Sequence, residues 1–448
     1  MDFSLSSSLV GSAVSNPDKI ALDLQFAADK TLSARKGPTP VFTRGSSGTF
    51  VGSNGLIQSA GNNVARFDHD PVSRACKGLL IEESRTNAAR YSGQLVIGTG
   101  WSANATPSVT SIVDGLGPDG NNAYEVAEAA NTGSHTLFNT GGTGTTGATS
   151  VVSGITYTGS TFVKKVAGSV DWIQLSFSTV GFGSVQYANF NISNGTIGNF
   201  SSSSPQIQAA GNGWYRCSVS AAATVTTATT SNLFTAFTND VDTTTRLPSY
   251  AGNTANKILA AMGQFETGSF PTSYIPTTTT SVIRSADVCS ISGSAFSGFY
   301  NPLEGSLFTS AIFNAPVAYG ASQAIIDIND TTVANRLRLT RGNASGFAAF
   351  NNTSNNNLNA SIPSSTASQS FTVQKCSAGF KLDDFVFYTN NSQIGSDNSG
   401  AMIVSPTTFT IGDASAEFTP RLYLNGTLSA IRYYRKRLPN AKLASLTV

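Results

Sequence analysis

Charge is the scarcest property of this chain. Only 12% of its 448 residues are Asp, Glu, Lys or Arg, and the formal net charge is +2. A net charge this small creates only a weak electrostatic field, which does not indicate a nucleic-acid partner. No basic stripe with interleaved aromatics is present either. The basic run from Arg432 to Arg437 is accounted for as a solvated final strand. Ser, Thr, Asn and Gly must therefore form the polar surface, which favours turn-rich antiparallel β structure over long helices.

Residues that bind metals or carry out catalysis are also few. The four cysteines stand singly with no CxxC pair, which indicates neither a zinc site nor a redox motif and fits assembly in a reducing cytoplasm. The two histidines, His69 and His135, lie in no recognisable triad or zinc motif. Glu82 and Glu83 are adjacent, so on a strand they point to opposite faces and cannot form one acid–base pair. We therefore predict no enzymatic activity and no cofactor.

Long apolar runs are missing as well. No stretch reaches the roughly 18 apolar residues of a membrane-spanning helix. The start, MDFSLSSSLVGSAV, lacks the basic and long apolar regions of a secretory signal peptide. We expect no membrane insertion, and any export to follow a route other than the general secretory one.

The apolar residues that are present alternate with polar ones. Hydrophobic residues make up 40% of the chain, enough for sizeable cores. A period of two recurs in the segments SVDWIQLSF, SVQYANFNI and NGWYRCSVS. Asn-Gly and Pro turns separate such segments, as between Phe50 and Ile57. The pattern predicts an all-β fold: tandem antiparallel β-sandwiches of jelly-roll type after a small N-terminal β or irregular region.

The run from Gly263 to Val288 marks where the chain divides. Pro271 and Pro276 remove backbone donors and push the preceding residues toward extended geometry. Four threonines follow and favour an extended linker over a helix. We therefore predict three regions, which are an N-terminal arm and docking region (1–91), a jelly roll (92–276) and a second sandwich (285–448).

Four sequence blocks stand in order along the chain: FDHDPVSRACKGLLIEESRTN (67–87), NGWYRCSVS (212–220), GQFETGSFPTSYIPT (263–277) and LNGTLSAIRYYRKRLPNAKLASLT (424–447). Together they resemble the recurring blocks of bacteriophage tail and appendage proteins. In that group, similar blocks bracket a carbohydrate-binding-module-like jelly roll and a C-terminal concanavalin A-like or laminin-G-like sandwich. This chain departs from the group at Ala88 to Tyr91, where many relatives have a second hydrophobic run, and residues 1–40 match nothing that can be placed.

The resemblance implies a non-enzymatic virion structural protein, assembled in the host cytoplasm. We expect a tail or head fibre with lectin-like sandwiches, a homo-oligomer with a trimer favoured. Other virion proteins and a host-surface glycan are the expected partners. A capsid decoration or neck protein with a purely structural role is the alternative, and a polysaccharide depolymerase is the rival from a different class. The resemblance also places Glu82, Glu83, Arg85 and Asn87 in an interdomain polar network.

A glycan site requires aromatic rings for the sugar faces and amides or arginines for the hydroxyls. The outward positions of three alternating strands have this chemistry, and we predict that they form one exposed carbohydrate-binding face. They are Trp172, Gln174, Tyr187, Asn189, Trp214 and Arg216. The alternative is that this face packs on a neighbouring domain or subunit.

Two further candidates have simpler interpretations. His69 lies between two aspartates beside a proline, and we interpret it as a buried, hydrogen-bonded turn residue. Calcium is common in laminin-G-like sandwiches, and Asp327, Asn329 and Asp330 form the best local oxygen cluster. Their spacing matches no known loop motif and a hairpin turn accounts for them, so we predict no metal site.

Overall fold

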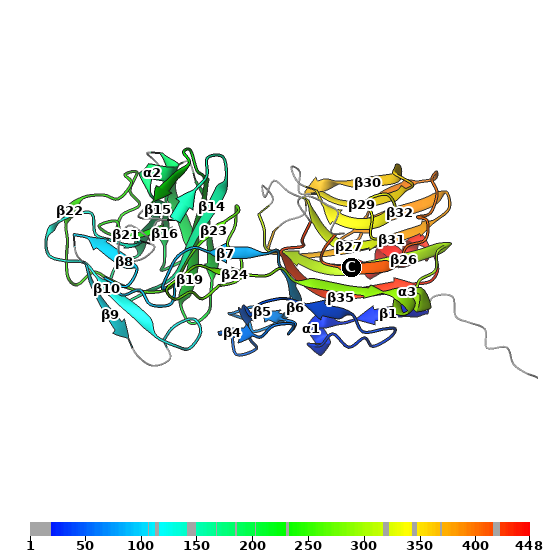
Figure 1. Cartoon of the computed structure of the whole chain (residues 1–448), viewed down its shortest axis with the longest axis horizontal. Coiled ribbons are helices and arrows are strands. Elements are labelled where there is room, and N and C mark those ends of the chain that lie inside the picture. The colour runs from blue at the N-terminus through cyan, green and yellow to red at the C-terminus, as the bar shows by residue number, and fades with distance from the viewer. Residues whose placement is uncertain are drawn as a thin grey trace, which may run out of the picture.

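The computed structural model shows two β-sandwiches side by side along the long axis of the molecule (Figure 1). It describes residues 19–105, 107–112, 116–140, 149–166, 168–183, 186–201, 203–229, 233–316, 322–342, 347–367, 370–414 and 422–448. The first 18 residues of the predicted docking arm lie outside this part of the chain. The strands pair antiparallel throughout the large sheets, which confirms the predicted all-β fold of tandem sandwiches.

One sandwich is built from two sheets, here named A and B. Sheet A has the order β33-β32-β31-β26-β35-β6-β5, with β1 also on β35. Its strands are β1 (Ile20–Leu24), β5 (Phe67–His69), β6 (Cys76–Ile81), β26 (Glu304–Phe313), β31 (Val373–Lys381), β32 (Asp384–Thr389), β33 (Ser392–Asp397) and β35 (Gly426–Tyr434). Sheet B has the order β2-β25-β34-β27-β28-β29-β30. Its strands are β2 (Val41–Thr43), β25 (Val288–Ser292), β27 (Gln323–Asn329), β28 (Arg336–Arg341), β29 (Phe347–Ser354), β30 (Asn357–Ala367) and β34 (Thr408–Ile411).

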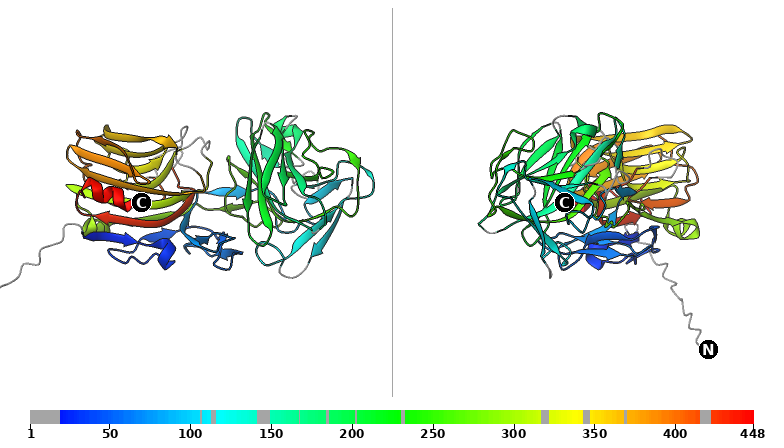
Figure 2. Two further views of the ribbon diagram at one scale, coloured as in Figure 1. Left: turned by 180° about the vertical axis from the view of Figure 1, so that it is seen from behind. Right: turned by 60° about the vertical axis from the view of Figure 1, so that its left-hand side comes forward.

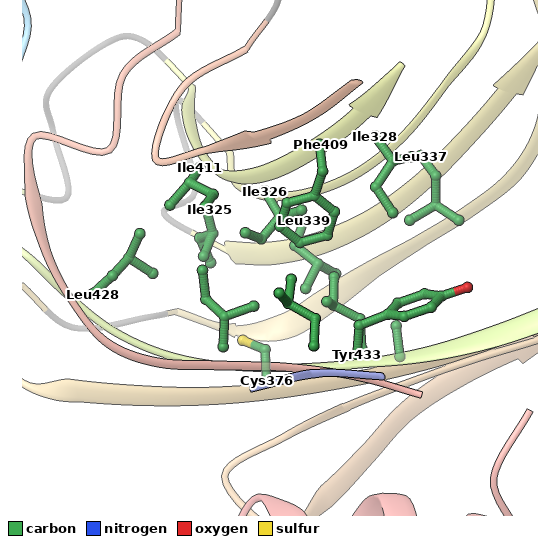
Figure 3. Packing of buried hydrophobic residues seen from close by; sticks show 14 of the residues in the cluster. Ile325, Ile326, Ile328, Leu337, Leu339, Cys376, Phe409, Ile411, Leu428 and Tyr433 are labelled. Carbon is green, nitrogen blue, oxygen red and sulfur yellow. The ribbon is translucent and has the colours of Figure 1, made fainter. Parts of the chain in front are cut away.

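The predicted N-terminal region supplies strands to both sheets of this C-terminal sandwich. β1 and β6 pair with successive parts of β35, and β2 pairs with β25. In Figures 1 and 2 these N-terminal strands run along the lower edge of the sandwich formed by the C-terminal half. Leu22, Leu24 and Ile81 are fully buried in its core, together with the side chains that Figure 3 shows between the sheets. Residues from the two ends of the chain therefore share one hydrophobic core.

The jelly roll is built from two further sheets, here named C and D. Sheet C has the order β17-β16-β15-β21-β12-β8 and sheet D the order β18-β19-β14-β23-β10-β9. The strands of sheet C are β8 (Trp101–Asn104), β12 (Thr136–Asn139), β15 (Trp172–Phe177), β16 (Tyr187–Asn191), β17 (Thr196–Ser201) and β21 (Leu233–Phe237). Those of sheet D are β9 (Ser108–Ile112), β10 (Ala123–Ala127), β14 (Thr156–Lys165), β18 (Ser204–Ala209), β19 (Trp214–Ala222) and β23 (Lys257–Thr267).

The core of the jelly roll follows the predicted alternation. Ile173, Leu175 and Phe190 point into it with Cys217 and Val219, and all five are fully buried. Phe177, Phe182 and Phe265 add an aromatic cluster, with the rings of Phe177 and Phe182 stacked at 4.6 Å. This packing holds sheets C and D together.

Short elements complete the fold. The small ribbons pair β3 (Gly48–Val51) with β4 (Ile57–Ala60), β7 (Arg85–Asn87) with β24 (Val282–Arg284), β11 (Thr132–Gly133) with β22 (Tyr250–Ala251), and β13 (Thr149–Val151) with β20 (Thr227–Thr229). The helices are α1 (Phe26–Asp29), α2 (Thr179–Phe182), α3 (Gly293–Phe299) and α4 (Asn440–Leu446). The hairpin predicted between Phe50 and Ile57 is confirmed, and α4 begins directly after Pro439 and buries Leu443.

The two sandwiches are joined by the β7/β24 ribbon and by the segment that precedes β24. Figure 1 shows the ribbon crossing between them. The Pro-containing segment predicted as an extended linker is docked rather than free, since Tyr274, Ile275 and Thr277 are all buried. The Ile275 amide donates to Gln264 Oε1 at 2.7 Å. The segment that connects the two sandwiches is therefore packed against the protein along its length from Tyr274 to Thr277.

Candidate functional site

Four of the six predicted glycan-binding residues share one face of sheet C. Gln174 lies opposite Asn189 in the β15/β16 pair, with Trp172 and Tyr187 nearby on the same face. The segment 238–247 covers this face, because Gln174 Nε2 donates to Thr245 O at 3.1 Å and Asn189 Nδ2 donates to Asp242 Oδ1 at 2.9 Å. The Tyr187 hydroxyl donates to Thr244 O at 2.8 Å. The two amides have no exposed surface, and their hydrogen-bonding groups are directed to the covering segment.

The other two predicted residues lie on sheet D. Trp214 is 2% exposed among Ala261, Met262 and Tyr274, and its Nε1 donates to Leu116 O at 2.8 Å. Arg216 Nη1 donates to Thr272 O at 2.6 Å. The expectation of one exposed face is therefore wrong. Alternation gave the outward direction of each side chain, but it carries no information on which segment folds back over a face.

The predicted interdomain network is present and larger than expected. Its centre is a group of five buried residues, here named the junction cluster: Arg44, Arg66, Glu82, Arg284 and Asp287. Arg66 lies 2.8 Å from Glu82 Oε2 and 2.5 Å from Asp287 Oδ2, and Arg44 lies 3.1 Å from Asp287 Oδ1. These ion pairs tie the loop before β3, the residue before β5 and the end of β6 to β24 and the segment that leads into β25.

The remaining predicted network residues extend this cluster to both sandwiches. Arg85 forms an ion pair with Glu83 and lies 5.0 Å from the ring of Phe270. The Glu83 amide donates to Asn425 Oδ1 at 2.9 Å, which reaches the start of β35. Asn87 Nδ2 donates to Ile275 O at 2.8 Å, and its Oδ1 accepts from the Phe265 amide in the jelly roll. The interpretation of Glu82, Glu83, Arg85 and Asn87 as an interdomain network is confirmed.

The electrostatics of Glu82 follow from its neighbours. Burial alone would raise the pKa of this carboxyl, but the charges of Arg284 and Arg66 and hydrogen bonds from Ser273 lower it to about 2. Ser273 N and Oγ each donate to it at 2.7 Å. Glu82 is therefore an ionised structural group that anchors the 271–274 segment.

An interdomain cleft of about 770 Å³ lies beside this network. One wall is the outer face of sheet D at β18 and β19, and the other is formed by β3, β5, β6 and the turn at 70–73. Ser273 and Tyr274 of the docked segment contribute, as do Asn314 and Phe371 of the C-terminal sandwich. Clefts of this size between domains are common places for ligands.

The sheet D wall is rich in amides. Gln206 and Gln208 alternate along β18, an edge strand of its sheet, and Gln208 lies directly opposite Arg216 on β19. The Arg216 guanidinium is also 5.3 Å from the ring of Phe162, another lining residue. Gln206 Oε1 and Arg216 Nε are buried and have no hydrogen-bond partner in the described part of the chain. One acceptor and one donor in this wall are therefore unpartnered, and a ligand in the cleft would reach them only after their side chains turn toward it.

The opposite wall carries carboxylates that are already engaged. Asp68 pairs with Lys77 at 2.5 Å and accepts from the Val51 amide at 2.7 Å. Asp70 Oδ1 accepts from the backbone and side chain of Ser73; burial alone would raise the pKa of Asp70, but these bonds and that from Val72 lower it. Phe371, at 45% exposed, and the half-buried Phe50 supply aromatic surface.

The remaining candidates have structural roles. His69 is buried and its Nδ1 is 3.1 Å from Val51 O, but it lies in β5 rather than in a turn. Asp327 lies in β27, 3.7 Å from Arg336 Nη1, and Asp330 Oδ1 accepts from Thr332 in the turn that follows. The hairpin interpretation of that cluster is confirmed. Among the described residues, no three His, Cys, Asp or Glu side chains are grouped to hold a metal ion.

Sequence reasoning missed the cleft, although part of its signal was present. Gln206 and Gln208 alternate in SPQIQA, an amide pattern of the same kind as Gln174 with Asn189. Nothing in the sequence places this edge strand against residues 50–73. No helix in the described residues is long and apolar enough to cross a membrane.

Comparisons with known proteins give low-similarity structural matches. No protein-family model matches the chain, and no curated protein matches it. The chain is similar to CBM40 of the Ruminococcus gnavus IT-sialidase bound to α2,3-sialyllactose, with 12% identity and a TM-score of 0.30 over 34% of this chain and 86% of that one. It is also similar to the NanB sialidase of Streptococcus pneumoniae, with 15% identity and a TM-score of 0.29 over 35% of this chain and 26% of that one.

A SAP-like pentraxin from Limulus polyphemus matches with 11% identity and a TM-score of 0.25, over 32% of this chain and 70% of that one. At this level of similarity none of the matches carries an argument about ligand or activity. The resemblance to phage appendage proteins and the laminin-G-like assignment stay predictions. Any function has to be argued from the residues of this chain.

Proposed function

We propose that this chain is a non-enzymatic virion structural protein, a tail or head fibre or similar appendage, that attaches to a host-surface glycan through the interdomain cleft. The ordered blocks of sequence support the virion role. The chemistry of the cleft supports the glycan. Other virion proteins and further copies of the chain, with a trimer favoured, are the proposed partners.

The observation that carries the glycan proposal is the sheet D wall. Gln206 and Arg216 line the cleft, and Gln206 Oε1 and Arg216 Nε are buried and lack partners among the described residues. A buried polar atom without a hydrogen bond is costly, and a sugar hydroxyl can both donate and accept. Hydroxyls of a sugar in the cleft can therefore satisfy these atoms once the two side chains turn toward it. Phe371 and Phe50 offer apolar surface for the C–H face of the ring.

The state of the cleft carboxylates supports a binding role over hydrolysis. A glycosidase needs one carboxylic acid that is protonated at working pH and a second carboxylate opposite it. Glu82 has a pKa of about 2 because of Arg284, Arg66 and Ser273, and hydrogen bonds lower the pKa of Asp70. Asp68 is paired with Lys77. None of these groups is arranged as a general acid.

The test is binding to a glycan panel with matched variants. Phe371→Ser removes an exposed ring of the cleft, and Phe200→Ser removes a ring that is 54% exposed outside the cleft lining. We expect Phe371→Ser to weaken binding about tenfold, a loss of about 1.4 kcal/mol, and Phe200→Ser to leave it unchanged. Gln206→Leu fills the same space without the acceptor and should weaken binding similarly. Equal affinity for all variants would exclude the cleft as the site.

The virion role has a separate test. Cryo-EM of intact particles should place this chain in an appendage, at a copy number set by that appendage. A position repeated with the symmetry of the whole capsid would instead assign it a decoration role. Incubation of the purified protein with capsular polymers should leave their length unchanged, and shortened polymer would support a depolymerase.

A further inference from the structure

The end of the C-terminal sandwich that is far from the jelly roll carries three exposed leucines. β26 reaches the interdomain cleft at Ile312, so its first residue, Glu304, lies at the opposite end of the sandwich, where Figure 1 shows α3. At this end Leu303 is 76% exposed, Leu382 is 63% exposed and Leu358 is 61% exposed. A single exposed leucine needs no explanation, but a group of them on one surface indicates a contact with another molecule.

Strand pairing brings the first two of these leucines together. Glu304 lies opposite Lys381 in the β26/β31 pair. Leu303 directly precedes Glu304, and Leu382 directly follows Lys381 in the β31/β32 turn. The two leucines therefore occupy neighbouring positions at the end of the paired strands.

The third leucine adjoins the same turn through one intermediate residue, Gly400. The amide of Asp383, the residue after Leu382, donates to Gly400 O at 3.1 Å. Gly400 is also packed against β30, because a Cβ there would lie 2.6 Å from Asn359 O, and Leu358 is the residue before Asn359. The three leucines thus form a row that runs from β26 through the β31/β32 turn to β30.

Unpaired charges of opposite sign lie along this row. β35 lies beside β26 on the side away from β31, and Arg435 and Lys436 follow its last residue. Asn301 Nδ2 donates to Arg435 O at 2.7 Å, which holds this basic segment next to the loop of Leu303. On the other side of that leucine, Asp383 is exposed in the β31/β32 turn. Arg435 and Lys436 are exposed as well, and none of these three charged side chains has an ion pair in the described part of the chain.

The remaining charges at this end balance one another. Lys381 lies 3.4 Å from Asp384, and Arg437 lies 2.9 Å from the same carboxylate. The Arg437 amide donates to Glu304 Oε2 at 3.0 Å. Two basic groups and two carboxylates therefore compensate locally, which leaves the basic pair and the single carboxylate described above available to a partner.

We propose that a second copy of this chain docks on this surface, here named the distal face, in a two-fold contact. The distal face consists of Leu303, Leu358, Leu382, Asp383, Arg435 and Lys436. A two-fold axis reverses the row, so Leu303 of each copy meets Leu382 of the other. The same operation places Arg435 of each copy against Asp383 of the other, so the face is complementary to itself in charge. The contact is additional to the proposed trimer and does not depend on glycan binding.

Sedimentation of the purified full chain tests the contact. We expect a weak association, with a Kd on the order of 10 μM, because three leucines per copy form only a small apolar core. The mass of the particle should therefore double as the chain concentration rises from about 1 to about 100 μM. The mass at the lowest concentration reports the proposed trimer separately, so the two proposals can fail independently. A mass that stays constant over this range would overturn the distal contact and leave a different protein as the occupant of the face.

Replacing the leucines gives a matched comparison. The double variant Leu303→Ser with Leu382→Ser should weaken the association at least tenfold, because it removes the apolar core of the contact. Val180→Ser serves as the control, since Val180 is 61% exposed on α2 of the jelly roll, and it should associate as the wild type does. All three side chains are exposed, so circular dichroism should show each variant folded. An association that the leucine variant leaves unchanged would exclude the distal face.

Charge reversal tests the two-fold arrangement itself. Changing Arg435→Glu and Lys436→Glu together should weaken the association, because like charges then face Asp383 of the other copy. Adding Asp383→Lys to this variant should restore it, since the opposite signs again meet across the axis. A failure of the combined variant to recover would contradict the proposed arrangement.

Discussion

At the scale of single residues, Glu82 gives the sharpest expectation. Its pKa in the folded chain is about 2, below the ordinary value, because Arg284, Arg66 and Ser273 overcome the effect of burial. A lowered pKa means that the carboxylate stabilises the folded state above the ordinary pKa near 4.5 and loses this contribution as the pH falls toward 2.

We therefore expect Glu82→Gln to be less stable than the wild type at pH 7 by about 3 kcal/mol, and the difference to shrink as the pH falls from 4.5 to 2. Urea unfolding at a series of pH values measures this. Asp397→Asn, which changes a partly exposed carboxylate on β33, serves as the control and should show a small difference. A Glu82→Gln difference that is constant with pH would contradict the argument.

The same residues show what the sequence could predict at this scale. Glu82, Glu83, Arg85 and Asn87 were expected in an interdomain network because the resemblance of the block 67–87 to phage appendage proteins implies it, and each is found there. Their partners Arg66 and Asp287 were missed, since ion pairs between distant positions leave no local pattern. Gln174 and Asn189 were expected to be exposed, but the covering segment 238–247 binds them.

At the scale of elements, the antiparallel pairing of β6 with β35 depends on one glycine. Gly78 has φ +109°, and a Cβ there would lie 1.9 Å from Leu428 O. Gly154 also has a positive φ, +81°, but a Cβ there meets nothing within 4 Å. An alanine at either position would strain the backbone, but only at Gly78 would its Cβ also clash with the neighbouring strand. Comparing the two positions therefore separates the cost of the strain from the cost of the clash.

We expect Gly78→Ala to destabilise the chain by about 3 kcal/mol or more, because β6 must move away from β35, and Gly154→Ala to cost only about 1 kcal/mol. Chemical denaturation of both variants measures the difference. Equal destabilisation would mean that the strands separate easily and that β6 contributes little to sheet A.

Local patterns predicted many strands but not their partners. The strands β15, β16 and β19 follow from alternation, because a strand with one face toward the core imposes a period of two on its own residues. β1 was missed, since its segment matched nothing and its partner β35 lies at the far end of the chain. Pairing between such distant strands depends on the complete fold.

At the scale of the whole molecule, the two sandwiches differ in how much of the chain they need. Sheets C and D take all their strands from β8 to β23, within residues 101–267. Sheets A and B also need β1, β2, β5 and β6, which bring the buried side chains of Leu22, Leu24, Leu79 and Ile81. Burial of each such side chain contributes about 2 kcal/mol, so their loss together, about 8 kcal/mol, is comparable to the whole stability of a typical domain.

We therefore predict that residues 88–281 fold when expressed alone, whereas residues 285–448 do not. Thermal unfolding followed by circular dichroism should show a cooperative transition for the first fragment and none for the second. Mixing the second fragment with residues 19–87 should restore a cooperative transition, because those residues carry the missing strands of both sheets.

The jelly-roll fragment serves as the control. None of its strands comes from residues 19–87, so it should give the same transition with or without them. A cooperative transition of residues 285–448 alone would show that the C-terminal sandwich does not depend on the N-terminal strands, and that their pairing with β35 and β25 adds stability without being required for folding.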